Sequence, residues 1–166
     1  MNGQETQFFG KYRAKVNDNQ DPLMQGRIKV TTLSDILESE VSGWAMPCVP
    51  YAGDGIGLFL IPPVGAFVWI EFEHGDPDTP IWSGCFWAEG QTPPSPAAPE
   101  QKVLKTEAGS LTINDTPGSE SITIETKNKM KIKIDMNGIE IDDGQNGKVK
   151  LTGPKVSIND GALEVT

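Results

Sequence analysis

Two patterns of apolar and polar residues divide this chain of 166 residues. After residue 103, aliphatic side chains occupy alternate positions of short runs, and polar residues fill the positions between them. Successive side chains of a β-strand point to opposite faces, so this alternation predicts strands that each bury one face. The aliphatic positions are Leu111, Ile113, Ile122, Ile124, Met130, Ile132, Ile134, Met136, Ile139, Ile141, Val149, Leu151, Val156, Ile158, Leu163 and Val165.

Turn-forming residues separate these runs at positions 115–118, 137–138, 146–147, 153–154 and 160–161. About seven strands are therefore expected, which at about 4.8 Å between neighbours stack to roughly 35 Å. Lys127, Lys129, Lys131 and Lys133 alternate with the aliphatic residues. They predict a charged outer stripe that keeps the strands soluble and discourages lateral pairing.

The first 88 residues show a different pattern of short β-rich segments between Gly, Pro and Asp turns. Segments at 8–16, 27–32, 44–49, 66–72 and 81–87 predict five strands, and the near-continuous apolar run at 67–72 indicates a strand covered on both faces. Five short strands in this length fit a small closed barrel such as an OB-fold. Residues 34–40 carry a weak helical signal that a loop would satisfy equally well.

The two halves also differ in composition. All 12 aromatic residues lie between Phe8 and Trp87, and a stretch rich in proline follows at 89–102. Prolines lack the amide that strand pairing needs, so this stretch is expected to be an extended connector. The predicted organisation is therefore an OB-fold domain at 1–88, a Pro-rich linker at 89–102 and a β-needle at 103–166.

A needle segment without aromatic residues offers a single chain little apolar surface to bury in a core. Small domains bury too little surface to offset the entropy of ordering, and a flat sheet leaves both edges open. Both difficulties disappear if three copies wrap around one axis with their aliphatic faces inward. The fold class predicted is thus all-β, an OB-fold barrel followed by an intertwined trimeric β-helix, or β-prism; a monomeric solenoid is the alternative.

Composition argues against several classes of function. The formal net charge of −9 argues against nucleic acid as a partner, since phosphate binding needs clustered Lys and Arg. Trp44, Trp69, Trp82 and Trp87 could stack on single-stranded bases, but packing and subunit contact suit an acidic barrel better. No apolar run reaches the roughly 18 residues of a membrane span. Cys48 and Cys85 are expected to be small buried thiols, with a disulfide as the alternative.

Carboxylates around the only histidine are the one arrangement that suggests a metal or acid–base site. Glu71, Glu73, Asp76 and Asp78 surround His74 in the sequence. A solvated strand end followed by a turn explains the same residues. We therefore expect no catalytic residues, no cofactor and no metal, and the glycines at 53, 55 and 57 are expected to form a turn.

An ordered series of motifs carries a resemblance to a known family. The series comprises residues 26–30, 43–50, 53–57, 62–72 and 75–81; its most specific parts are the Pro-Val-Gly before the apolar strand and the Gly-Asp-Pro-Asp-Thr-Pro turn after it. It resembles the OB-fold domain of phage baseplate central spike proteins, the baseplate assembly protein V family. It is also similar to the VgrG spikes of the type VI secretion system. Residues 105–125 resemble the passage from that barrel into the β-helical needle.

The resemblance implies partners and a location. It implies a homotrimer that docks on a baseplate hub protein and carries a PAAR-type tip protein, and that meets the target cell envelope during injection. The location implied is a virion tail baseplate, or an extracellular contractile injection particle, assembled in the cytoplasm of the producing cell. The chain lacks the family's hub region, its lysozyme-like insert and its His-x-His iron site, so we expect a separate hub chain and no wall-degrading activity.

The function predicted is a structural, membrane-piercing spike rather than an enzyme; the alternative is a non-piercing OB-fold adaptor within a larger assembly. The terminal residues are expected to form a docking platform for the tip protein, and a frayed terminus is the alternative. The predicted tip-docking residues are Leu163, Val165 and Thr166. The predicted trimer core comprises Met130, Ile132, Ile134, Met136, Ile139, Ile141, Val149, Leu151, Val156 and Ile158.

Overall fold

The computed structural model describes residues 6–33, 41–94 and 97–165. The described chain is all-β apart from two short 3-10 turns, as predicted, and it separates into two compact units, Met1–Gln91 and Thr92–Thr166. The weak helical signal at 34–40 and the predicted docking residue Thr166 lie outside the described residues. No helix within the described ranges has the length and apolarity of a membrane span.

The first unit is a curled five-stranded sheet in the order β2-β1-β6-β7-β3. Its strands are antiparallel except for the parallel pair β3 and β7. An isolated bridge between Ile28 and Ala45 joins the segments that carry the two edge strands, so the sheet closes on itself as an OB-like barrel. The strands are β1 (Tyr12–Asp18), β2 (Lys29–Thr32), β3 (Met46–Pro47), β6 (Phe67–Phe72) and β7 (Pro80–Phe86).

The barrel interior holds one cluster of buried hydrophobic side chains. Alternate residues of β1 and β6 point inward, and two register irregularities, in the pairing of β1 with β2 and of β6 with β7, supply the curvature that closure needs. Trp82 from β7 is buried among them, and its indole Nε1 donates to the Gly26 carbonyl at 3.1 Å. The core comprises Ala14, Val16, Ile28, Val30, Ala45, Val68, Ile70, Phe72 and Trp82.

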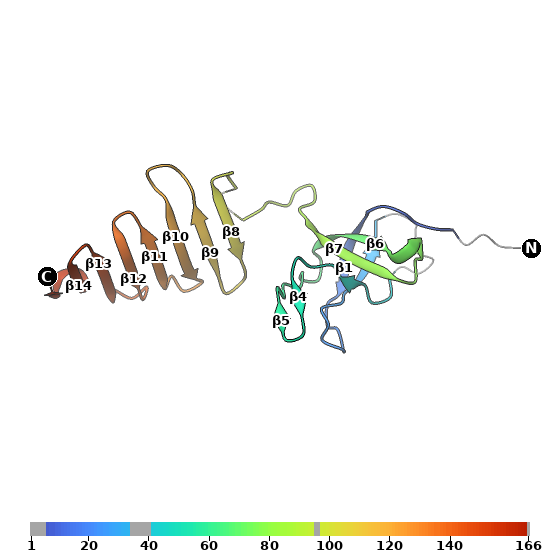
Figure 1. The fold of residues 1–166 in the computed structure, drawn as a ribbon, viewed down its shortest axis with the longest axis horizontal. Helices are drawn as coiled ribbons and strands as arrows, with labels where there is room; N and C mark the ends of the chain where they lie inside the picture. Colours follow the sequence, from blue (N-terminus) through green and yellow to red (C-terminus); the bar gives the residue numbers. More distant parts are fainter. Residues whose placement is uncertain (1–5, 34–40, 95–96, 166) are drawn as a thin grey trace, which may run out of the picture. The chain divides into compact units, whose positions relative to one another are not determined.

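A small hairpin stands apart from the barrel sheet. It joins β4 (Ala52–Gly53) to β5 (Ile56–Gly57), and it forms a separate two-stranded sheet (Figure 1). The glycines at 53, 55 and 57 thus belong to a tight hairpin, as predicted. The 3-10 turn η1 (Glu73–Gly75) follows β6 and contains His74 at φ 54.

The second unit is one antiparallel meander of eight strands in strict sequence order (Figure 1). One more strand is present than the sequence predicted, because β8 was missed; its first two residues fall in the predicted linker. A second 3-10 turn, η2 (Asn159–Gly161), precedes the last strand. The strands are β8 (Gln101–Lys105), β9 (Gly109–Asn114), β10 (Ser121–Thr126), β11 (Lys131–Asp135), β12 (Gly138–Asp142), β13 (Lys148–Thr152), β14 (Lys155–Ile158) and β15 (Leu163–Val165).

Gly138 at the start of β12 is required by close backbone approach. A Cβ there would overlap the Leu151 carbonyl oxygen of β13, and φ is 131°. Gly138→Ala is therefore expected to lower the free energy of unfolding of this unit by about 1–3 kcal/mol, measured by chemical denaturation. Gly118→Ala is the matched control, because φ is 81° but the site is open. Equal effects of the two variants would contradict this steric explanation.

Candidate trimerisation face

One face of the eight-stranded sheet is formed by two columns of aliphatic side chains. The pairing register places one residue of every strand from β9 to β15 in each column, and β8 adds Leu104 to the first and Lys102 to the second. Residues opposite one another in a sheet point to the same side, so each column is continuous. The first column is Leu104, Leu111, Ile124, Ile132, Ile141, Val149, Ile158 and Leu163; the second is Ile113, Ile122, Ile134, Ile139, Leu151, Val156 and Val165.

These columns are uncovered in the single chain. Apart from the partly buried Val149, their members are between 36% and 60% exposed, and none of the described residues in the second unit is buried. Isolated exposed aliphatic residues are ordinary, but a continuous apolar face over eight strands marks a surface that another molecule covers.

The opposite face is polar, and its charged side chains form ion pairs with one another. Lys131 contacts Glu140 at 3.1 Å, Lys150 reaches the same carboxylate at 4.0 Å, and Lys150 contacts Asp160 at 2.6 Å. The hydrogen bond between Lys150 and Asp160 raises the pKa of the lysine and lowers the pKa of the aspartate. Each exposed pair stabilises the sheet little, but together they give this face balanced charge and an affinity for water.

Only two of the four lysines of the predicted charged stripe lie in a strand. Lys131 and Lys133 lie in β11 on the polar face, and Lys133 pairs with Asp135 at 2.8 Å. Lys127 and Lys129 lie in the turn before β11, where Lys129 has φ 70°. The alternation in the sequence continues through this turn, and for that reason it overestimates the extent of the strand.

The structure brings together most of the residues predicted for the trimer core. Eight of the ten lie in the two columns, whereas Met130 and Met136 flank β11 at its two ends and Met136 is 75% exposed. Leu163 and Val165, predicted for tip docking, form the last level of the same columns in β15. The columns also extend toward β8 through residues that the predicted core omitted, although most carried the same alternation: Leu104, Leu111, Ile113, Ile122 and Ile124.

The described polar residues of the barrel form local hydrogen bonds and ion pairs. Glu71 accepts hydrogen bonds from Lys11 and from Ser83, and the Lys11 bond lowers the pKa of this carboxyl. No group of three or more potential metal ligands occurs within residues 6–33, 41–94 and 97–165. Both cysteines are free, but they are exposed rather than buried as expected; partial burial raises the pKa of the Cys85 thiol.

The tryptophans serve several structural roles. Trp82 belongs to the core, while the Arg13 guanidinium lies 5.6 Å from the ring centroid of Trp69 and the Lys29 ammonium 4.8 Å from that of Trp44. The chain's own cations therefore cover two of these rings, which agrees with packing rather than base stacking.

Each of the two units matches a known protein family. The profile of the Type VI secretion system/phage-baseplate injector OB domain matches residues 12–87, and that of the phage baseplate V C-terminal trimerisation domain matches residues 101–164. These domains define the class: a spike component of a tail baseplate or injection apparatus. The chain belongs to the phage baseplate V family, a structural and non-enzymatic family.

Curated relatives show distant similarity over part of the chain. The type VI secretion system spike protein VgrG3 of Vibrio cholerae serotype O1 is 32% identical over 128 residues, covering 70% of this chain and 12% of the relative. Spike protein VgrG4b of Pseudomonas aeruginosa is 32% identical over 96 residues, covering 52% and 12%. The actin cross-linking toxin VgrG1 of Vibrio cholerae serotype O1 is 34% identical over 109 residues, covering 58% and 10%. The chain thus spans a small part of each relative.

Proposed function

We propose that this chain is the membrane-piercing central spike of a contractile tail or injection baseplate, acting as a homotrimer. One observation carries the proposal: the eight-stranded sheet exposes two aliphatic columns that are continuous from β9 to β15, and none of its described residues is buried. The trimerisation-domain match supports three copies as the cover for this face.

In the proposed trimer the columns of three chains meet along one axis. Fully burying an aliphatic side chain contributes about 1.5–3 kcal/mol to stability. Each strand from β9 to β15 contributes one aliphatic residue to each column, and in the trimer these two residues would meet the same two residues of the other chains. The paired polar face remains toward water. The trimer core then contains the eight predicted column residues from Ile132 to Ile158 and extends through β9 and β10.

The strand lengths support a pointed needle. After β8, which has five residues, they decrease from six residues in β9 and β10 to five in β11–β13, four in β14 and three in β15. At about 3.4 Å per residue the strand span falls from roughly 20 Å to roughly 10 Å, and eight strands at about 4.8 Å cover roughly 34 Å. A body that narrows toward its C-terminal end, and whose strength lies in backbone pairing, suits piercing.

The two ends have different proposed partners. The OB barrel docks on a baseplate hub protein, and the β15 end carries a PAAR-type tip protein that meets the target envelope. Similarity to relatives named as type VI secretion system spike proteins supports a place in such an apparatus. The proposed location is the baseplate of a virion tail or of an extracellular injection particle.

The mass of the purified chain tests the proposal. Three chains of 18.0 kDa give 54 kDa, and light scattering coupled to size exclusion is expected to report this value. A stable species of 18 kDa over a range of concentrations would overturn both the trimer and the spike.

A further inference from the structure

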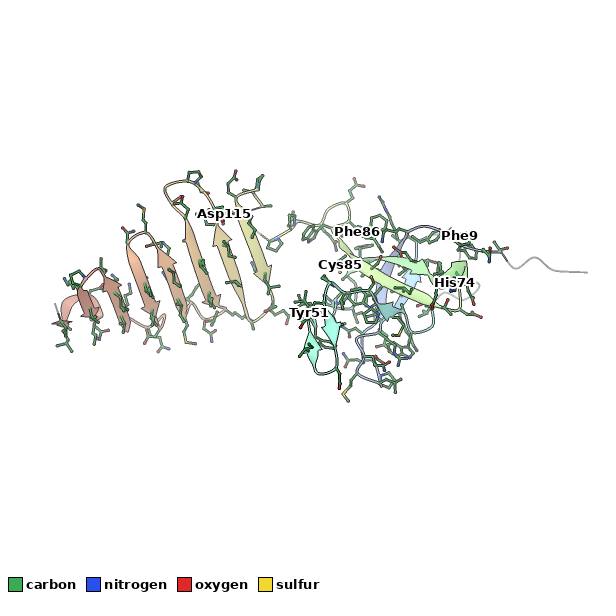
Figure 2. The ribbon with its side chains drawn as sticks, in the orientation of Figure 1. Phe9, Tyr51, His74, Cys85, Phe86 and Asp115 are labelled. Atoms are coloured by element: carbon green, nitrogen blue, oxygen red, sulfur yellow. The ribbon has the colours of Figure 1, made fainter. Side chains whose placement is uncertain are left out.

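The barrel unit has an apolar surface that its OB-like core does not explain. It begins in the β4–β5 hairpin and continues through the following segment, where every residue from 51 to 60 is exposed. Ile56, Leu58, Phe59 and Leu60 are the large apolar side chains beyond the first hairpin strand, and Phe59 is 69% exposed. Tyr51 marks the start of this region in Figure 2.

A second segment adds to this surface, the turn at residues 21–27. The Asp21 carboxylate accepts hydrogen bonds from the backbone amides of Leu23, Gln25 and Arg27 and pairs with the Arg27 guanidinium at 2.6 Å. Only 3% of the Asp21 side chain is exposed. The turn is therefore fixed from within, while it presents Leu23 and Met24 to solvent.

Met24 is an unusual residue for such a position. It has φ 52°, a left-handed conformation that non-glycine residues adopt rarely, and it is 85% exposed. Strained backbone persists where the surroundings enforce it and frequently marks a functional site. A rigid turn that holds an apolar side chain outward loses little conformational freedom on binding.

The two segments meet at Gly26. A Cβ at this residue would lie 2.9 Å from the Ile61 Cδ1 and 3.2 Å from the Phe59 Cε2, so side chains of the segment after the hairpin lie directly against the turn. We call the combined surface the loop surface; it comprises Leu23, Met24, Ile56, Leu58, Phe59 and Leu60.

The chemistry of the loop surface is that of a protein interface. Residues 51–64 contain one charged side chain, Asp54, although the first 102 residues carry thirteen Asp or Glu against six Lys or Arg. Depletion of charge around rigid apolar groups is typical of the centre of an interface. In an acidic domain, such a neutral patch is also where two copies would repel each other least.

We propose that the loop surface packs against the barrel of a second copy of this chain, so that the OB units associate with one another inside the trimer. The inference rests on the proposed trimer, because the needle brings the barrels together. β7 ends at Phe86 and β8 begins at Gln101, which leaves a connector of 14 residues that reaches at most about 50 Å. Tethers of this length hold linked domains at effective concentrations near the millimolar range, where a modest apolar contact forms.

Distances between spin labels in the full-length trimer test this contact. The label is placed at Gln20→Cys, an exposed position beside the turn, in a Cys48→Ser, Cys85→Ser background. Pulsed dipolar spectroscopy is expected to give one narrow distribution. Phe59→Ser is expected to broaden it, whereas Phe9→Ser is the matched control, because Phe9 is also 69% exposed but lies beside Gly75 and His74, away from Tyr51 (Figure 2).

Met24→Gln is a second variant of the loop surface. Because the Met24 side chain is 85% exposed, its replacement is expected to leave folding unchanged. We expect it to broaden the distribution of distances between spin labels, as Phe59→Ser does. A trimeric mass with a broad distribution in the parent protein would overturn the contact between barrels while leaving the spike intact. A narrow distribution that neither loop-surface variant changes would overturn the contact in the same way. A monomeric mass without dipolar signal would overturn the proposed function together with this inference.

Discussion

Replacing Ile132 by Asp is expected to abolish the trimer. Ile132 lies in the middle of the first column, opposite Ile124 on one side and Ile141 on the other. In the proposed needle, the substitution places three carboxylates at one level of an apolar interior. An uncompensated buried charge costs several kcal/mol for each copy, which exceeds what the neighbouring levels can offset. Light scattering should then report the mass of one chain, and the exposed columns should make the variant prone to aggregate.

The matched control introduces the same side chain on the polar face. Thr123 lies in β10 opposite Lys133, so Thr123→Asp gains a cation as its neighbour. We expect this variant to keep the trimeric mass and a free energy of unfolding within about 0.5 kcal/mol of the parent. Equal tolerance of Asp at 123 and 132 would show that the aliphatic columns do not form the trimer interior.

The needle strands were predictable because their alternation is regular and their turns carry Gly, Asn, Asp or Pro. β8 escaped prediction because Lys102 occupies an inward-facing position and Pro-rich sequence precedes it. Lys102 instead pairs with Asp115, beyond the end of β9. Alternation also identified which residues share a face, but not that they form two columns. That arrangement depends on the length of each turn, which sets the register between strands.

The barrel was predictable as a set of short strands, but its surface was not. Motif order identified the OB domain, and the apolar run in β6 indicated a strand covered on both faces. In the structure, the outer side of that strand is covered by aromatic packing of Trp69 on Phe86, with ring centroids 4.7 Å apart, and by Arg13. The sequence at 17–26 indicates a turn, but it does not predict the pairing of Asp21 with Arg27 or the strained Met24, because both depend on hydrogen bonds that only the folded turn makes.

The C-terminal end of the needle is where the last large effect is expected. β15 is the shortest strand of the needle, and its outer edge presents backbone amides and carbonyls that pair with no other strand among the described residues. Leu163 and Val165 end the two columns there, each more than half exposed. Exposed strand edges are normally covered or blunted. A partner that adds strands or an apolar base would satisfy both the edge and the column ends.

Deleting residues 161–166 is therefore expected to abolish capture of a purified PAAR-type protein, the proposed tip partner, in a pull-down by the trimer. Leu163→Ser retains the strand and is expected to weaken binding about tenfold or more, since it exchanges an apolar anchor of the platform for a hydroxyl. Leu111→Ser in β9 is the matched control near the other end of the same column; it should cost similar trimer stability and leave tip binding unchanged. If the truncated trimer holds the tip protein as tightly as the full-length trimer, the platform lies elsewhere, and β15 is a frayed end rather than a docking site.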